Sequence, residues 1–273
     1  MASPYPHYAW AGGHFLLLAA SLRYLLAWIT FKSVAYVFWY KLAFIGALAS
    51  YAIVVYKSLG MPQPNMAYLR KAMADENFQY FILALYWFSS KPMALALIPY
   101  ATFSLFHVLT FTRTNLIPRV LPTTPVAGQS DRTAQHPIAK TLHAWVKANY
   151  DPAMRSVAWT ELVIFARVIL GAMIGIIPYI NRLPIRNSLL SPLLFAHFLR
   201  LRYFHSAFTR QVIQASDVII TNHVNAPGTN PTLKKAVDTG RAMVVRWCTS
   251  AIQPQAPGPA PAPAAGAAAG ARR

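Results

Sequence analysis

Long apolar runs restrict what this chain can fold into more than any other feature of the sequence. The most informative stretch is 65–113, where an apolar run over 78–88 is broken and a second apolar run over 93–111 follows. A bilayer span needs about 20 mostly apolar residues, so the second run is long enough and the first is not. The break consists of Ser89, Ser90, Lys91 and Pro92.

Two interpretations of this stretch remain open. Proline has no amide donor and restricts the residue before it, so Lys91-Pro92 cannot continue an ordinary helix. The first interpretation is a helical hairpin that enters the membrane, turns at 89–92 and leaves. The second is one ordinary span over 93–111, preceded by a half-buried amphipathic helix.

The overall composition indicates a polytopic membrane protein. Of the 273 residues, 56% are hydrophobic and 12% are charged, and that charged share is about half the usual soluble value. The chain has 25 Lys and Arg against 7 Asp and Glu, a net charge of +18. Anionic lipid headgroups or nucleic acid would complement this charge. The membrane content favours lipid, no basic-aromatic nucleic-acid module is visible, and basic cytoplasmic flanks alone produce such a bias.

The predicted fold is an all-α integral membrane protein with several transmembrane or hairpin helices, C-terminal amphipathic interfacial helices and a disordered tail. A short N-terminal tail (1–13) precedes a membrane domain over 14–205. The helical runs of that domain are 14–31, 34–56, 65–88, 93–111, 156–180 and 187–204, with a Pro-rich loop over 113–137 and a short surface helix over 138–149. An amphipathic region (206–251) and a Pro/Ala/Gly-rich tail (252–273) follow.

Pairing of the runs into three hairpins (14–31 with 34–56, 78–88 with 93–111, 156–180 with 187–204) would place the basic stretches on the cytoplasmic side. Small residues cluster around Gly46 in the second run, a pattern that lets helix backbones approach closely in lipid.

The segment 232–251 is the clearest amphipathic helix in the sequence. At about 100° per residue, its apolar side chains share one arc, with Val245 as the one exception, and its basic side chains occupy the rest. An apolar arc that contains Trp and is edged by Lys and Arg is typical of a helix lying in a membrane interface. The alternative is packing on the protein's own surface. The predicted interface residues are Leu233, Lys234, Lys235, Val237, Arg241, Val244, Arg246 and Trp247.

Ionisable residues inside the apolar runs are candidate functional residues because their burial in lipid is costly. They are Arg23, Lys41, His107, Glu161 and Arg167. Glu161 and Arg167 lie six residues apart, about 240° around a helix, so they do not pair with each other. Arg23 is within reach of Glu161 across helices, and the alternative is that Glu161 faces headgroup water. A structural role is expected for these residues.

The sequence contains no motif for catalysis or cofactor binding. The single cysteine, Cys248, allows neither a disulfide within the chain nor a Cys-based zinc site. The eight histidines form no metal-ligand motif, and no P-loop, G-x-S-x-G or G-x-G-x-x-G occurs. We therefore expect a protein that is not an enzyme and binds no metal and no cofactor. The N-terminus lacks a basic n-region and an A-x-A site, so we expect the first run to be retained as a span.

The sequence resembles the transmembrane protein 33 family, whose fungal branch is called the pore membrane protein of 33 kilodaltons. The similarity covers roughly residues 15–250 as a scattered pattern with order and spacing kept. The residues behind it are Tyr40-Lys41, Ala47-Leu48, Ser50, 71–76 (KAMADE), Tyr80, Ser90-Lys91-Pro92, Ile98-Pro99, 103–107 (FSLFH), 110–112 (TFT), Ala148-Asn149, Glu161 and 198–203 (FLRLRY).

The resemblance implies a multi-pass protein of the endoplasmic reticulum and nuclear envelope. Its implied partners are the lipid bilayer with its anionic lipids, reticulon-type proteins, nucleoporins and an import receptor, and its implied roles are shaping of tubular reticulum and organisation of nuclear pore complexes. No catalytic residues come with it. The expected function is therefore non-enzymatic membrane shaping. The alternatives are an adaptor that binds partners through basic segments, and a solute or lipid carrier that uses Glu161 with Arg23 or His107.

Overall fold

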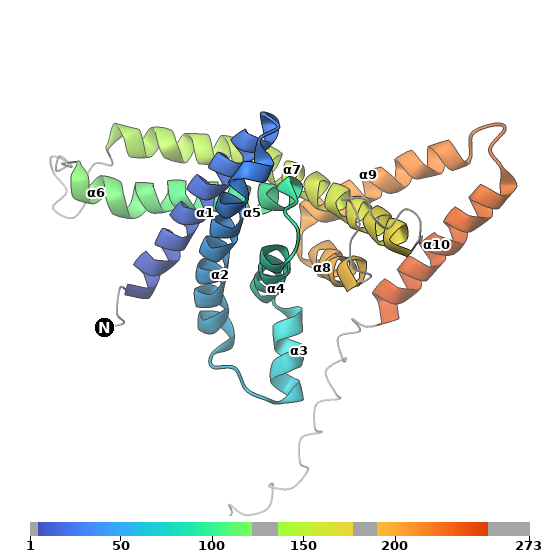
Figure 1. Cartoon of the computed structure of the whole chain (residues 1–273), viewed down its shortest axis with the longest axis horizontal. Coiled ribbons are helices and arrows are strands. Elements are labelled where there is room, and N and C mark those ends of the chain that lie inside the picture. The colour runs from blue at the N-terminus through green and yellow to red at the C-terminus, as the bar shows by residue number, and fades with distance from the viewer. Residues whose placement is uncertain (1–4, 122–135, 177–189, 251–273) are drawn as a thin grey trace, which may run out of the picture. The chain divides into compact units, whose positions relative to one another are not determined.

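The computed structural model describes residues 5–121, 136–176 and 190–250, and every regular element in these ranges is a helix (Figure 1). The chain divides into two compact units, Met1–Ser216 and Asp217–Arg273. The predicted disordered tail lies outside the described residues. The elements are α1 (Tyr5–Ile29), η1 (Ser33–Tyr36), α2 (Val37–Leu59), α3 (Met66–Ala74), α4 (Glu76–Ser89), α5 (Ala94–Phe111), η2 (Thr112–Leu116), α6 (Ile117–Val120), α7 (Pro137–Ile176), α8 (Leu190–His205), α9 (Ala207–Val224) and α10 (Pro231–Ser250).

Four helical stretches are long and apolar enough to cross a bilayer: Tyr5–Ile29, Ser33–Leu59, Ala94–Val120 and Pro137–Gly175. These stretches expose large apolar side chains, which would be unfavourable in water and are expected where a surface faces lipid acyl chains. Examples are Leu22, Leu26, Ile45, Val163 and Leu170. The helices and the four spans confirm the predicted all-α integral membrane fold.

α1 and α2 form the most closely packed pair of helices, and they run side by side in Figure 1. Gly13 and Gly46 lie where the two backbones meet. A Cβ atom built on Gly46 would lie 2.6 Å from the carbonyl oxygen of Gly13 and 2.8 Å from the amide nitrogen of Leu17. Close approach of helices at small residues, predicted from the cluster around Gly46, is confirmed at this contact.

Aromatic side chains fill the centre of the first unit. Tyr51 of α2 stacks on Tyr80 of α4, with ring centroids 5.6 Å apart, and Tyr80 also meets the ring edges of Tyr100 (α5) and Phe198 (α8). The Tyr100 hydroxyl donates a hydrogen bond of 2.8 Å to the carbonyl oxygen of Tyr80. Edge-to-face contacts of this kind add to the burial of the rings, so Tyr80 joins four helices.

The two arms of the predicted hairpin, 78–88 (α4) and 93–111 (α5), each have closer neighbours than one another. α4 packs against α2 and α8, whereas α5 packs against α1 and α7. α4 and α5 still touch, through Tyr80 and the rings of Tyr100 and Phe103. α4 is also absent from the four candidate spans found among the described residues. The membrane hairpin and the single span preceded by a half-buried amphipathic helix both stay predictions for this stretch.

The predicted helical run 65–88 is two helices in the structure. α3 ends at Ala74, and Asp75 has an extended backbone with φ −86° and ψ 124°. The Asp75 side chain accepts a hydrogen bond of 2.9 Å from the amide of Phe78 and so caps α4. Aspartate is among the preferred N-cap residues because its short side chain satisfies an amide at the helix start. The sequence Asp75-Glu76 could have indicated that a second helix starts here.

Three further helix boundaries differ from the expectation. α7 continues through Pro152, so the predicted short helix 138–149 and span 156–180 belong to one helix as far as Ile176. The first helix begins at Tyr5, with Pro6 in its first turn, and the helix after α5 continues through Pro118 to Val120. Proline is tolerated in a first turn, where its missing amide has no partner to lose.

Candidate functional site

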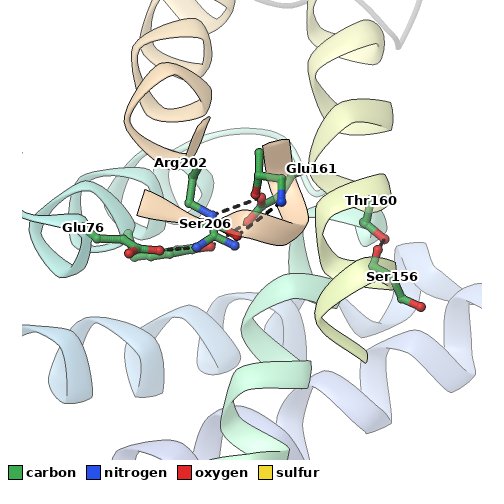
Figure 2. A network of polar contacts seen from close by, with 8 residues as sticks. Glu76, Ser156, Thr160, Glu161, Arg202 and Ser206 are labelled. Carbon is green, nitrogen blue, oxygen red and sulfur yellow. Dashed lines mark hydrogen bonds and ion pairs between the residues drawn. The ribbon is translucent and has the colours of Figure 1, made fainter. Parts of the chain in front are cut away.

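Three helices bring two buried charges and one half-buried charge together at one place in the first unit. Glu161 comes from the middle of α7, Arg202 from the last turn of α8, and Glu76 from the first turn of α4. Figure 2 shows the guanidinium of Arg202 between the two carboxylates. The three residues are separated by 41 and 126 positions in the sequence, so the cluster exists only in the folded chain.

Glu161 is the most deeply buried member, with 1% of its side chain exposed, against 8% for Arg202 and 33% for Glu76. Arg202 Nε lies 3.3 Å from Glu161 Oε2, and Arg202 Nη1 also pairs with Glu76 Oε1. The Tyr80 hydroxyl donates a hydrogen bond of 2.6 Å to Glu161 Oε1. Both carboxylate oxygens of Glu161 thus have a partner, as burial of a charge requires.

The electrostatics of the cluster favour a charged Arg202. Burial lowers the pKa of Arg202, but Tyr80, Glu161 and Glu76 raise it by more, so its pKa lies above the usual range. The guanidinium therefore stays protonated and joins α4, α7 and α8.

The cavity beside Glu161 has a volume of about 10 Å³, about the space that one water needs. The described residues contain no group of three possible metal ligands, so the geometry supports a structural junction.

Arg23 does not take part in this cluster, and the predicted pairing of Arg23 with Glu161 is wrong. Its guanidinium lies 4.1 Å from the ring centroid of Tyr36, in a cation–π contact near the end of α1. The other prediction, that Glu161 faces headgroup water, is also wrong because Glu161 is buried. Arg202 was missed as the partner. Arg202 lies among the apolar side chains of 198–204, and a charge in such a segment was the signal that it needs a buried partner. Arg202 was used only to mark the end of that run.

Lys41 of α2 binds the end of α4. Its Nζ donates to the carbonyl oxygen of Phe88, and to that of Ser90 over 2.9 Å. The last carbonyls of a helix have no partner within the helix, and a cation there is also favoured by the helix dipole. Lys41 therefore caps α4 where the chain turns toward α5.

The four residues predicted as a turn lie at this end of α4. α4 ends at Ser89, and α5 begins at Ala94. The Ser89 and Ser90 hydroxyls donate to the carbonyl oxygens of Leu85 and Tyr86. Lys91 is exposed and Pro92 is partly buried.

The remaining intramembrane candidates lie in other places. His107 of α5 packs against α1, with its ring centroid 4.5 Å from that of His14 and 5.1 Å from that of Trp10. His14 Nδ1 is 2.9 Å from the hydroxyl of Ser104. Arg167 is half-buried on α7. The structure thus brings only Glu161 of the predicted polar residues into the cluster with Arg202.

α10 exposes its apolar and basic side chains together. Leu233, Met243 and Val244 are 53%, 66% and 59% exposed, Val237 is half-buried, and Lys234, Lys235 and Arg246 are exposed. The side chain of Trp247 lies outside the described residues.

Arg241 of α10 is bound within the second unit. Its guanidinium contacts Asp217 (2.8 Å), Asp238 (3.9 Å) and the hydroxyl of Thr221 (2.7 Å). The sequence assigned Arg241 to the lipid interface, whereas the structure gives it an additional role in joining α9 and α10.

Comparison with known proteins agrees with the membrane fold. The sequence model described as transmembrane protein 33/nucleoporin POM33 matches residues 2–250. Nucleoporin POM33 of Chaetomium thermophilum is 34% identical over 243 residues, which cover 85% of this chain and 82% of that protein. Tetra-spanning protein 1 of Schizosaccharomyces pombe is 30% identical over 253 residues (90% and 85%). The pore membrane protein of 33 kDa of Saccharomyces cerevisiae is 25% identical over 252 residues (88% and 82%). No solved structure gives a significant match.

Proposed function

Because the chain belongs to the transmembrane protein 33/nucleoporin POM33 family, we propose that it is a non-enzymatic protein of the endoplasmic reticulum and nuclear envelope that stabilises strongly curved membrane, including the membrane of the nuclear pore. The names of the relatives place two of them at the pore. The name of a third describes four spans, the number of candidate spans among the described residues of this chain.

The observation that supports the shaping role is the exposed apolar face of α10. A helix with such a face and flanking cations buries it at the boundary between headgroups and acyl chains and expands that leaflet. Full burial of one Val or Leu side chain contributes about 1.5–3 kcal/mol. Each Lys or Arg near an anionic surface contributes about 1 kcal/mol. Lys234 and Lys235 would add this attraction, while the contacts of Arg241 reduce its share.

The cluster around Arg202 supports the same role in a different way. A wedge deforms a membrane only if the protein body resists deformation. The ion pairs of Arg202 join α4, α7 and α8, and the carbonyl contacts of Lys41 hold the end of α4 to α2. The small cavity beside Glu161 leaves no room for a solute, so the carrier alternative gains no support from the structure.

The test uses the full chain, fluorescently labelled and reconstituted in giant vesicles with anionic lipid, from which narrow membrane tubes are pulled. We expect the wild-type protein to be enriched on the tube relative to the flat membrane. Val244→Glu is expected to lower this enrichment, because the variant loses the about 1.5–3 kcal/mol that burial of the valine side chain contributes. Every 1.4 kcal/mol changes the equilibrium for membrane binding of α10 tenfold.

Ala242→Glu is the matched control. It introduces the same charge two residues away, about 160° around the helix from Val244, and should keep the wild-type enrichment. Equal enrichment of both variants and the wild type would contradict the proposal. The adaptor function, in which α10 binds another protein through its basic side chains, would then be favoured.

A further inference from the structure

α3 exposes a second apolar stripe in the first unit. Met66, Leu69 and Met73 recur at intervals of three and four residues, so they lie along one side of the helix. They are 64%, 47% and 36% exposed. Ala72, which is 1% exposed, lies about 90° around the helix from the centre of this stripe. The face that packs on the protein and the apolar stripe are therefore different faces of α3.

The charges of α3 suit an anionic surface. The helix contains Arg70 and Lys71 and no acidic residue, and both basic side chains are exposed. Arg70 borders the stripe, about 70° from its centre, whereas Lys71 points away from it. A basic side chain beside an apolar stripe can extend its charged end to headgroups while its stem stays against the apolar surface.

The chain holds α3 near the end of a membrane span. The span Ser33–Leu59 is joined to α3 by residues 60–65, which extended would reach at most about 20 Å. At the other end of α3, the Ser58 hydroxyl donates a hydrogen bond of 3.0 Å to Asp75 Oδ2. The Gln79 side chain donates a bond of 2.9 Å to the carbonyl oxygen of Met73. In Figure 1, α3 lies beside the end of α2 and below α4. The C-terminal end of α3 is thus held at the end of α2, and the linker 60–65 ties its N-terminal end to the same end of the span.

We propose that the stripe Met66–Leu69–Met73 of α3 lies in the interface of the bilayer leaflet at which α2 ends, with Arg70 at the anionic headgroups. The occupant of the stripe is the lipid surface. Two observations favour it over a partner protein: the direct continuation from a membrane span and the absence of acidic residues in α3. This contact site is separate from α10 and does not depend on the function proposed for α10.

Site-directed spin labelling of the full chain in anionic proteoliposomes tests the proposal. Cys248→Ser removes the native thiol, and single cysteines are introduced at 66, 67, 69, 71 and 73. We expect labels at 66, 69 and 73 to collide more often with oxygen, which concentrates in lipid, and labels at 67 and 71 with a water-soluble nickel chelate. The accessibility ratio should repeat about every 3.6 residues.

Uniform access of the chelate to all five positions would overturn the proposal, because it would place α3 in water. Poor access of both reagents to the stripe would also overturn it, because the stripe would then be covered by protein. A second arm adds Arg70→Gln to the Leu69→Cys background. This change should raise chelate access at 69, whereas Lys71→Gln should change it less. No difference between the two variants would refute the role of Arg70.

Discussion

Arg202→Met should destabilise the protein more than any other single change in the buried cluster. The substitution keeps most of the side-chain volume but leaves the carboxylate of Glu161, 1% exposed, with the Tyr80 hydroxyl as its remaining partner among the contacts described above. Removal of one partner from a buried ion pair costs about 3–5 kcal/mol. For a domain of 150–250 residues, 1 kcal/mol shifts the melting temperature by about 2–4 °C, so the expected loss is roughly 6–20 °C.

Glu161→Gln should cost less, about 1.5–3 kcal/mol, the range for a hydrogen bond to a charged group. The glutamine keeps a carbonyl oxygen that accepts from Tyr80, and Arg202 keeps Glu76 as a counter-ion. The double variant should cost less than the sum of the two single changes, because it no longer leaves a buried charge unpaired.

The measurement is the apparent melting temperature of the purified full chain in mild detergent, followed by tryptophan fluorescence. Arg210→Met is the matched control. Arg210 is exposed on α9, so this change should stay within about 0.5 kcal/mol of the wild type. The argument fails if Arg202→Met melts with the wild type, or if Glu161→Gln is the more damaging of the two. Either result would mean that the pair is not held together in the membrane protein as the structure shows.

Two further substitutions test the packing of α2 in the same melting assay. Gly46→Ala should cost about 1–3 kcal/mol, the range for overpacking, because its Cβ atom would meet the backbone of α1. The control Gly12→Ala should have little effect, because a Cβ atom there meets nothing within 4 Å. Equal effects of the two substitutions would contradict the close contact of α1 and α2. Lys41→Met should cost about 1–3 kcal/mol, because it removes the donor to two carbonyls at the end of α4. Lys57 is exposed, so the control Lys57→Met should be near neutral. A neutral Lys41→Met would refute the capping role.

The sequence predicted the helical membrane class from local properties alone. Hydropathy and run length are read along the chain, and a bilayer of fixed thickness converts them into spans. The cluster of small residues around Gly46 likewise marked a close helix contact, because glycine allows such contacts wherever they occur. Helix ends were harder. Asp75 starts a new helix that was not expected, and Pro152 fails to end one, because capping and packing outweigh the preference of a single residue.

The candidate site could be predicted only in part. Glu161 and Lys41 were identified as costly polar residues inside apolar runs, but their partners were not. Arg202 lies 41 positions from Glu161, and the carbonyls bound by Lys41 lie 47 and 49 positions away. No local pattern states which of several distant charges will meet.

The sequence by itself therefore determined that this chain is helical, that it enters a membrane and which of its residues are expensive to bury there. The tertiary structure alone decided that α2 and α8 are the main neighbours of α4, that Arg202 and not Arg23 neutralises Glu161, and that the apolar stripe of α3 remains uncovered by the first unit. Hydropathy, span length and small-residue spacing depend on neighbours along the chain. The pairing of helices and charges depends on which distant surfaces pack together, and that is settled by the whole fold at once.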